Sequence, residues 1–394
     1  MRMRFRWFVL IMGLLGLCSA VDAQTDVPPV IFTGPLSHPR YDDGGVYFGM
    51  RFLHAKTNRQ LLSQQIAIRG INDGDGTLSG TGIPNTFVGS REEALNTAQL
   101  TGPGTYQPGW DLAIGYRFQS GVAVELGWRH LVQAKYHAAA SVLPPSFDVG
   151  AKFQNTFLYA PVVNFPTEFA GNPTNIPGVT NAATFGIWNA ASIMSIDLTQ
   201  RYDVYQVSAR IPIWQTDSYR SYGLFGPRIA WIWDRFDWRT VDADDTGSAG
   251  PDTTALYHNM VSNRMYGMHF GFGQDWFLGT TPIGALSFTM DLETGLYTNL
   301  VKANAGYRLA DRSISFNRAR RMSSFVPSVE ARLGFKWYPW EGISVDVGYD
   351  VQAYFNTIAS RRPVDFNVGI VDPEYDYGMF RWFYGLRFGV GFVF

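Results

Sequence analysis

The stretch that decides the fold is the last one, Phe380 to Phe394, which reads FRWFYGLRFGVGFVF. Its even positions are all large and apolar, whereas its odd positions are mostly glycine or arginine. Successive side chains of a β-strand point to opposite faces, so this strand has one apolar face and one polar or small face. An aromatic face that continues to a C-terminal phenylalanine is typical of an outer-membrane strand, with lipid on one side and a polar lumen on the other.

The composition excludes several classes of protein. The chain has 394 residues, of which 46% are hydrophobic and 15% aromatic, a balance too aromatic for disorder. One long apolar run, Phe8 to Val21, follows three arginines and predicts a signal peptide over residues 1–23, cleaved after Ala23. Cys18, the only cysteine, lies in this leader, so we expect no disulfide in the exported chain. The net charge of -1 gives no reason to expect nucleic acid as a partner.

Period-two alternation over the roughly 9 to 11 residues of a tilted transmembrane strand predicts an all-β, antiparallel up-and-down barrel of ten strands. The predicted strands are Gly45 to His54, Gly109 to Phe118, Val122 to Tyr136, Asp203 to Ile213, Tyr222 to Asp234, Arg264 to Phe277, Ala285 to Leu300, Ser328 to Trp337, Ile343 to Phe355 and Phe380 to Phe394. Twelve strands are possible if Phe157 to Val163 and Ser313 to Asn317 also enter the wall.

The connections between these strands alternate between short and long. In outer-membrane barrels the short turns face the periplasm and the long loops face outward, so both termini are predicted to be periplasmic. Residues 24–44 are then a proline-containing periplasmic tether, and residues 45–394 form the barrel. We expect the fifth strand to end or bulge near Asp234, where it leaves the membrane. Otherwise Arg235 and Asp237 would follow it onto the lipid face.

Charges of both signs occupy the predicted lumen face in near balance. A ten-stranded barrel is narrow, so most of these charges are expected to pair across strands, and any left unpaired would line a narrow water path. The candidate pore-lining residues are Arg51, Arg117, Arg129, Glu330, Arg332, Asp346, Asp350, Arg381 and Arg387. Among them Arg51, Arg381 and Arg387 are expected to form an anion-attracting stripe. Lys135 is also expected inside, and Gly389 is expected to leave space on the lumen face.

Two other groups of residues resemble a catalytic site and a metal site. His269 is the one inward histidine of the predicted sheet and lies near Asp275 and Asp291, but no serine is placed to complete a triad, so we predict no catalytic site. Asp242 and the acidic residues after it resemble half of a calcium loop, yet Thr253 stands where the closing glutamate belongs. We therefore predict no metal ion and no cofactor.

A basic segment between the predicted seventh and eighth strands includes Arg318, Arg320 and Arg321. Guanidinium groups suit phosphate oxygens, so these arginines are candidates for contact with lipopolysaccharide at the outer rim. A plain solvated run of charge fits the segment equally well.

The chain resembles the Legionella-type pore-forming major outer-membrane protein family. The stretches that carry the resemblance are YGLFGPRIAWIWDRFDW from Tyr222, MYGMHFGFGQDWFLG from Met265, VPSVEARLGFKWYP from Val326 and the terminal LRFGVGFVF. The resemblance implies an outer-membrane barrel with a pore-forming or porin-like role and no catalytic residues. The mature chain lacks the cysteine associated with the family's namesake, so disulfide-linked assembly is not expected.

These observations predict a protein of the cell outer membrane that lets small solutes or ions diffuse through a narrow pore. The alternative is a closed barrel with a structural or surface-adhesive role through its extracellular loops. The expected partners are outer-membrane lipid and lipopolysaccharide, small solutes, the barrel assembly machinery acting on the C-terminal strand that ends in Phe394, and a second copy of the chain.

Overall fold

The structure is a computed structural model that describes residues 45–58, 61–73, 80–82, 86–101, 106–141, 156–169, 187–188, 191–216, 218–242, 249–281, 284–340 and 342–393. The expected signal peptide and tether, residues 1–44, lie outside the described residues, as does Phe394. Among the described residues, no helix is long and apolar enough to cross a membrane.

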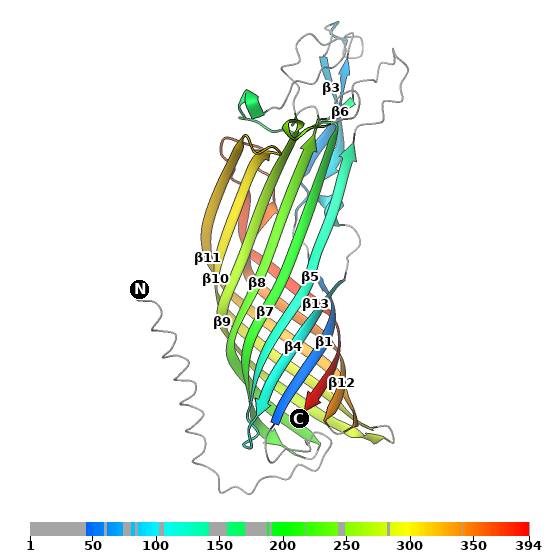
Figure 1. Cartoon of the computed structure of the whole chain (residues 1–394), viewed down its shortest axis with the longest axis vertical. Helices are drawn as coiled ribbons and strands as arrows, with labels where there is room; N and C mark the ends of the chain where they lie inside the picture. The colour runs from blue at the N-terminus through cyan, green and yellow to red at the C-terminus, as the bar shows by residue number, and fades with distance from the viewer. Residues whose placement is uncertain are drawn as a thin grey trace, which may run out of the picture.

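Ten antiparallel strands close into a barrel, in the order β1-β13-β12-β11-β10-β9-β8-β7-β5-β4 (Figure 1). The barrel strands are β1 (Gly45–Thr57), β4 (Gln107–Arg117), β5 (Ala123–Ser141), β7 (Ile193–Gln215), β8 (Tyr219–Val241), β9 (Thr254–Thr281), β10 (Gly284–Leu309), β11 (Ser315–Trp340), β12 (Ile343–Arg362) and β13 (Glu374–Val393). Strand β1 closes the ring by pairing with both β13 and β4. Each predicted strand corresponds to one of the ten, so the predicted fold class is confirmed.

A second, three-stranded sheet has the order β3-β2-β6 and was not predicted. It consists of β2 (Gln65–Asp73), β3 (Thr86–Asn96) and β6 (Thr156–Tyr159), and Figure 1 places it at the upper end of the barrel. Three short 3-10 helices lie in the connections. Helix η1 (Thr97–Thr101) follows β3, η2 (Thr167–Phe169) follows β6, and η4 (Pro251–Thr253) precedes β9. The twelve-stranded alternative is wrong: Phe157 belongs to β6 of this small sheet, and Ser315–Asn317 begins β11.

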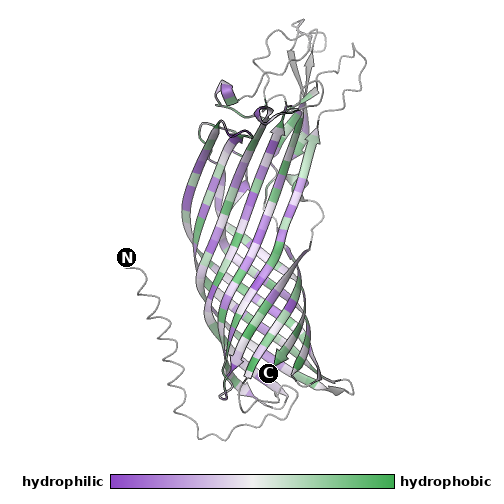
Figure 2. Cartoon of the chain, viewed as in Figure 1, coloured by the Kyte–Doolittle hydropathy of each residue, from purple (hydrophilic) through white to green (hydrophobic). Residues whose placement is uncertain are grey.

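Five strands are much longer than a membrane requires. Strands β7 and β8 have 23 residues, β10 and β11 have 26, and β9 has 28, against the roughly 9 to 11 that span a bilayer. The expected end or bulge near Asp234 is wrong, because β8 continues in register to Val241. Arg235 and Asp237 instead form an ion pair of 2.7 Å, on the part of β8 that extends beyond the apolar outer surface of the barrel. Figure 2 shows more hydrophilic residues on these upper extensions.

Burial follows the predicted facing of the side chains. On β13 most even positions are exposed, with Phe388 at 45%, whereas Arg381 and Arg387 are only 3% and 5% exposed. Lys135 is the exception to the expected facing. One extra residue of β5 is inserted between Leu131 and Ala134, so every later side chain changes face and Lys135 is exposed outside the barrel.

The upper half of the barrel is filled by an apolar core. Inward side chains of the long strands, such as Trp238, Tyr257 and Tyr307, pack against Phe169 and Trp188 of the connecting segments. All five side chains are essentially inaccessible to solvent. The extended strands therefore enclose a packed interior instead of an aqueous vestibule.

Candidate functional site

Glu330 of β11 holds together a buried ionic layer at the middle of the lumen. Three arginines donate to its carboxylate: Arg129 of β5 at 2.8 Å, Arg228 of β8 at 2.9 Å and Arg332 of β11 at 2.6 Å. Strands β5 and β11 lie on opposite walls of the ring, so the bond from Arg129 to Glu330 crosses the lumen. Arg228 also donates to Glu293 of β10 and is fully buried.

A second group of ion pairs adjoins this layer. Arg387 of β13 lies 3.0 Å from Asp346 and 2.7 Å from Asp350, both on β12. Arg51 of β1 shares Asp346 at 3.4 Å and lies 3.8 Å from Asp111. Asp111 in turn accepts from Arg129 at 3.0 Å, so the two groups form one continuous network.

Aromatic rings close the lumen next to this network. Tyr202 of β7 and Phe383 of β13 are stacked, with ring centroids 3.9 Å apart. The Tyr202 hydroxyl also bonds to Gln352 and lies 3.0 Å from the hydroxyl of Tyr354, both on β12 at the opposite wall. A cavity of only about 20 Å³ is lined by Tyr202, Phe383, Gln352 and Arg129. That is room for about one water molecule.

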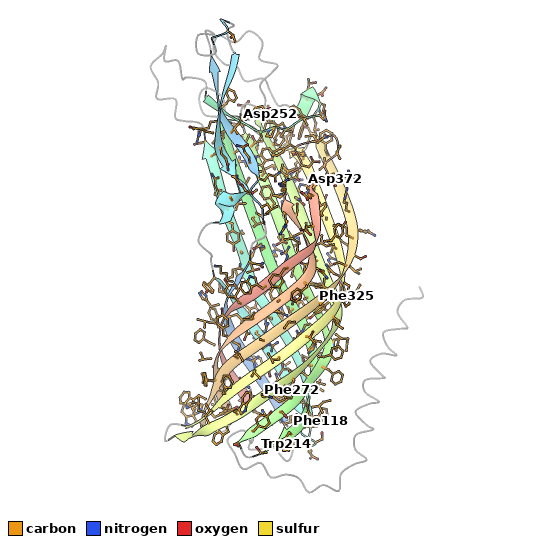
Figure 3. The ribbon with its side chains drawn as sticks, turned by 180° about the vertical axis from the view of Figure 1, so that it is seen from behind. Phe118, Trp214, Asp252, Phe272, Phe325 and Asp372 are labelled. Atoms are coloured by element: carbon orange, nitrogen blue, oxygen red, sulfur yellow. The ribbon has the colours of Figure 1, made fainter. Side chains whose placement is uncertain are left out.

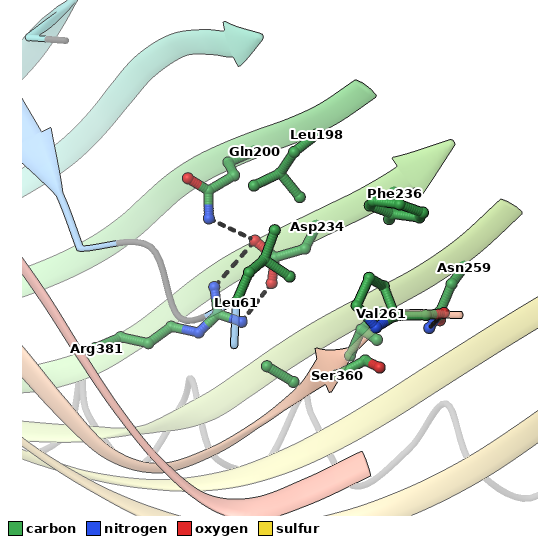
Figure 4. A pocket seen from close by; sticks show the side chains of 11 residues that line it. Leu61, Leu198, Gln200, Asp234, Phe236, Asn259, Val261, Ser360 and Arg381 are labelled. Carbon is green, nitrogen blue, oxygen red and sulfur yellow. Dashed lines mark hydrogen bonds and ion pairs between the residues drawn. The ribbon is translucent and has the colours of Figure 1, made fainter. Parts of the chain in front are cut away.

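A further clamp, drawn in Figure 4, starts from Arg381, two residues before Phe383 on β13. Arg381 of β13 donates to Asp234 of β8, on the opposite wall, with one bond of 3.0 Å. Gln200 donates to the same carboxylate at 3.0 Å. Leu61, from the segment after β1, lines the adjoining cavity of about 30 Å³. Three levels of the lumen are thus bridged by side chains.

The structure brings most of the predicted site residues together. The network joins Arg51, Arg129, Glu330, Arg332, Asp346, Asp350 and Arg387, while Arg381 forms the clamp above it. Arg117 lies apart, at the C-terminal end of β4 opposite Gly45. The expected anion-attracting stripe is absent from the described interior, because each of its three arginines has a carboxylate partner.

The aromatic layer was missed by sequence reasoning. Its signal was present in Phe383, a large apolar residue at an odd, lumen-facing position of the last strand. Tyr202 lies one residue before the predicted fourth strand and was not assigned a facing. Nothing in the local pattern indicates that these two rings meet, because they come from strands far apart in the ring.

The surroundings of His269 differ from the expectation. Its Nε2 lies 2.9 Å from Ser208 Oγ and 3.9 Å from Glu293 Oε2, so a serine is present after all. Asp275 pairs with Arg220 instead, and Asp291 accepts a bond from Tyr222. Ser208, His269 and Glu293 are 3%, 0% and 5% exposed, and neither of the two cavities described above reaches them. They lie in the packed wall of the lumen.

The predicted lipopolysaccharide contacts are divided between two faces of β11. Arg320 pairs with Asp372, while Arg318 lies 3.6 Å from that carboxylate and donates to the Ile370 carbonyl. Arg321 faces the other way, opposite Lys302 of β10. The segment is not a loop, because it continues the two strands in register.

No metal site is found among the described residues, where no group of three or more histidine, cysteine, aspartate or glutamate side chains gathers. Asp242 is buried, and the acidic residues that follow it, Asp244 and Asp245, lie outside the described part of the chain.

A family model matches the last part of this barrel. Residues 284–394 match the Legionella pneumophila major outer membrane protein family. The matched segment runs from β10 to the C-terminus and includes two of the four stretches that carried the resemblance, which is thereby confirmed over this range. The Legionella-type match and the closed ring of strands together make this an outer membrane β-barrel.

Several solved outer-membrane barrels are similar to the chain, all at low sequence identity. The outer membrane protease OmpT from Escherichia coli has a TM-score of 0.39 at 8% identity, covering 91% of this chain and 98% of that one. A Pseudomonas aeruginosa FadL homologue has a TM-score of 0.22 at 11% identity, covering 92% and 93%. An anion-selective porin from Comamonas acidovorans has a TM-score of 0.13 at 11% identity, covering 89% and 100%. No curated protein sequence matches the chain.

Proposed function

We propose that this outer membrane barrel is closed in its resting state, and that its extracellular half carries a structural or surface-binding role. The supporting observation is the bond from Arg129 to Glu330, which joins opposite walls of a lumen that is bridged at two further levels. Leaving one charge of a buried ion pair without its partner costs about 3 to 5 kcal/mol. A continuous water path requires several such pairs to separate together, which makes spontaneous opening rare.

The extracellular half has the features that this role needs. Its strands extend past the apolar surface, and its interior is a packed core of aromatic and aliphatic side chains. The small sheet β3-β2-β6 adds chain at the outer end. A packed core outside the membrane holds surface segments in a fixed arrangement, as a binding or structural surface requires.

A pore for passive diffusion of small solutes or ions is the second candidate. It is favoured by the charged lining, because well-packed apolar side chains would fill a closed lumen with equal or greater stability. It is also what the Legionella-type resemblance implies. In this form the ion pairs between Arg51, Asp346 and Arg387 would separate to admit water and then set the ion selectivity.

The proposal includes no catalytic role. Ser208 and His269 have hydrogen-bonding geometry, but both side chains are buried against Glu293 without an adjoining described cavity that would admit a substrate.

Single-channel recording of the refolded mature protein in planar bilayers tests the two candidates. Folding is checked first by heat-modifiable migration, and a known porin in the same bilayer serves as the positive control. We expect a silent bilayer from the folded protein. Discrete openings would overturn the closed barrel and favour the pore. In that case the paired change Arg129→Gln and Glu330→Gln must alter the conductance, because these side chains cross the lumen.

A further inference from the structure

Three outward cations lie at the upper edge of the apolar surface on neighbouring strands. Arg264 of β9, Lys302 of β10 and Arg321 of β11 are all exposed. On β10 the outward side chain before Lys302 is Leu300, and on β9 the one after Arg264 is Tyr266, both exposed and apolar. We call these three cations the rim cluster.

The backbone register brings the rim cluster together. Lys302 is directly opposite Arg321 in the pairing of β10 with β11. Arg264 is opposite Leu300 in the pairing of β10 with β9, which places it diagonal to Lys302. Side chains directly opposite on antiparallel strands have Cβ atoms about 4.5 to 5.5 Å apart, and diagonal neighbours about 7 to 8 Å. All three ammonium and guanidinium groups therefore reach one anion.

The cluster lacks the neutralisation found elsewhere in the barrel. Like charges directly opposite in a sheet are destabilising. In the part of the chain that the structure describes, none of the three cations has an ion pair or hydrogen bond to a carboxylate, whereas the arginines of the lumen network are all paired. The neighbouring outward positions are Ser262 and Ser323, whose hydroxyl groups carry no charge.

The depth of the cluster indicates which anion it meets. Trp231 is opposite Arg264 in the pairing of β8 with β9 and is 42% exposed. Outward tryptophans collect where the hydrocarbon ends and the headgroups begin. Below the cluster, Phe325 of β11 is exposed on the outer surface (Figure 3). The cations thus lie at the level of the outer-leaflet phosphates, with apolar side chains beneath them for acyl chains.

We propose that Arg264, Lys302 and Arg321 form a binding site for the phosphate groups of lipopolysaccharide. The guanidinium groups bind phosphate oxygens in a bidentate manner, and Lys302 adds a point charge between them. The proposed site keeps Arg321 from the sequence-based prediction and leaves out Arg318 and Arg320, which pair with Asp372 on the other face of β11. It is independent of whether the lumen conducts.

The test measures binding of bisphosphorylated lipid A to the refolded mature protein in detergent by native mass spectrometry. Each lysine or arginine near an anionic lipid surface contributes to the binding free energy. The loss of two such contributions weakens binding by about thirtyfold. We expect that loss in the double variant Lys302→Gln and Arg321→Gln, and a smaller one in Arg264→Gln. The matched control is Arg239→Gln, an exposed arginine on β8 far beyond the rim cluster, which should bind as the wild type does.

Two further arms identify the ligand. Lipid A without phosphates should bind the wild-type protein about as weakly as bisphosphorylated lipid A binds the double variant. Millimolar inorganic phosphate should not displace the lipid, because it lacks acyl chains. Equal affinity of wild type and a folded double variant, or equal affinity for the two lipids, would overturn the site. Full displacement by inorganic phosphate would overturn its assignment to a lipid.

Discussion

Tyr202 and Phe383 stack face to face across the lumen, with centroids 3.9 Å apart and ring planes at 20°. They come from β7 and β13, which are separated by β5, β4 and β1 on the shorter way around the ring. Both rings are nearly inaccessible, at 3% and 7% exposure. A contact between distant walls bridges the lumen at that level, and the adjoining described cavity has a volume of about 20 Å³.

Phe383→Ala tests this contact. Truncating a buried phenylalanine leaves a cavity and should lower the free energy of unfolding by about 3 to 5 kcal/mol, measured by urea titration in liposomes. The control is Phe388→Ala on the same strand, where lipid fills the space that the ring leaves. Equal losses in the two variants would contradict the packed lumen.

Arg228→Ala tests the ionic layer. This fully buried side chain binds Glu293 and Glu330. Its removal takes a positive charge away from both buried carboxylates, so we expect the free energy of unfolding to fall by about 3 to 5 kcal/mol. Adding Glu330→Gln should recover part of that loss by removing one buried charge. The exposed Arg239→Ala should change stability by less than about 0.5 kcal/mol. No recovery in the double variant would show that the carboxylates are solvated.

Phe388→Arg tests the facing of the last strand. An arginine facing lipid near the midplane costs about 2 to 4 kcal/mol, so insertion into liposomes should fall while Phe388→Leu inserts normally. Gly389→Ser is not a mild comparison, contrary to the expectation of free space there. A side chain at Gly389 would overlap Asp346 and Arg51. Normal insertion of Phe388→Arg would refute the assigned facing.

Because of His258, we expect the stability of the protein to depend on pH. Burial, with Arg235 and Arg308 nearby, lowers the pKa of this imidazole to about 4. Asp237 is opposite His258 but is bound to Arg235. Between pH about 6.5 and 4 the unfolded chain therefore binds a proton that the folded chain does not, so stability falls as pH falls through this window.

The measurement compares urea unfolding at pH 7 and pH 5 for the wild type and His258→Gln. The wild type should lose more stability than the variant on acidification, and its imidazole should not titrate between pH 8 and 5 by NMR. An imidazole midpoint near 6.5 would contradict the prediction.

The local pattern sufficed to locate the ten strands and to predict the side that most of their residues face. An alternation of period two allows only two facings for a strand. The wrong facing of β13 would place Arg381 and Arg387 in hydrocarbon. The pattern failed at Lys135, because a bulge changes the facing without any change in composition. It also failed past Trp233, because strands outside the membrane no longer need an apolar outer face and so carry no lipid-facing signal.

Period-two alternation was therefore enough to predict a barrel with a charged interior and to favour ten strands over twelve, since hydrocarbon penalises every misplaced charge. The closed ring of ten strands and the pairing of its charges follow from the three-dimensional arrangement. Arg129 and Glu330 are 201 residues apart in the chain, and Tyr202 and Phe383 lie on distant strands. The curvature and stagger of a closed ring bring such pairs together, and no local periodicity records them. The same holds for Ser208 beside His269 and for Lys302 opposite Arg321.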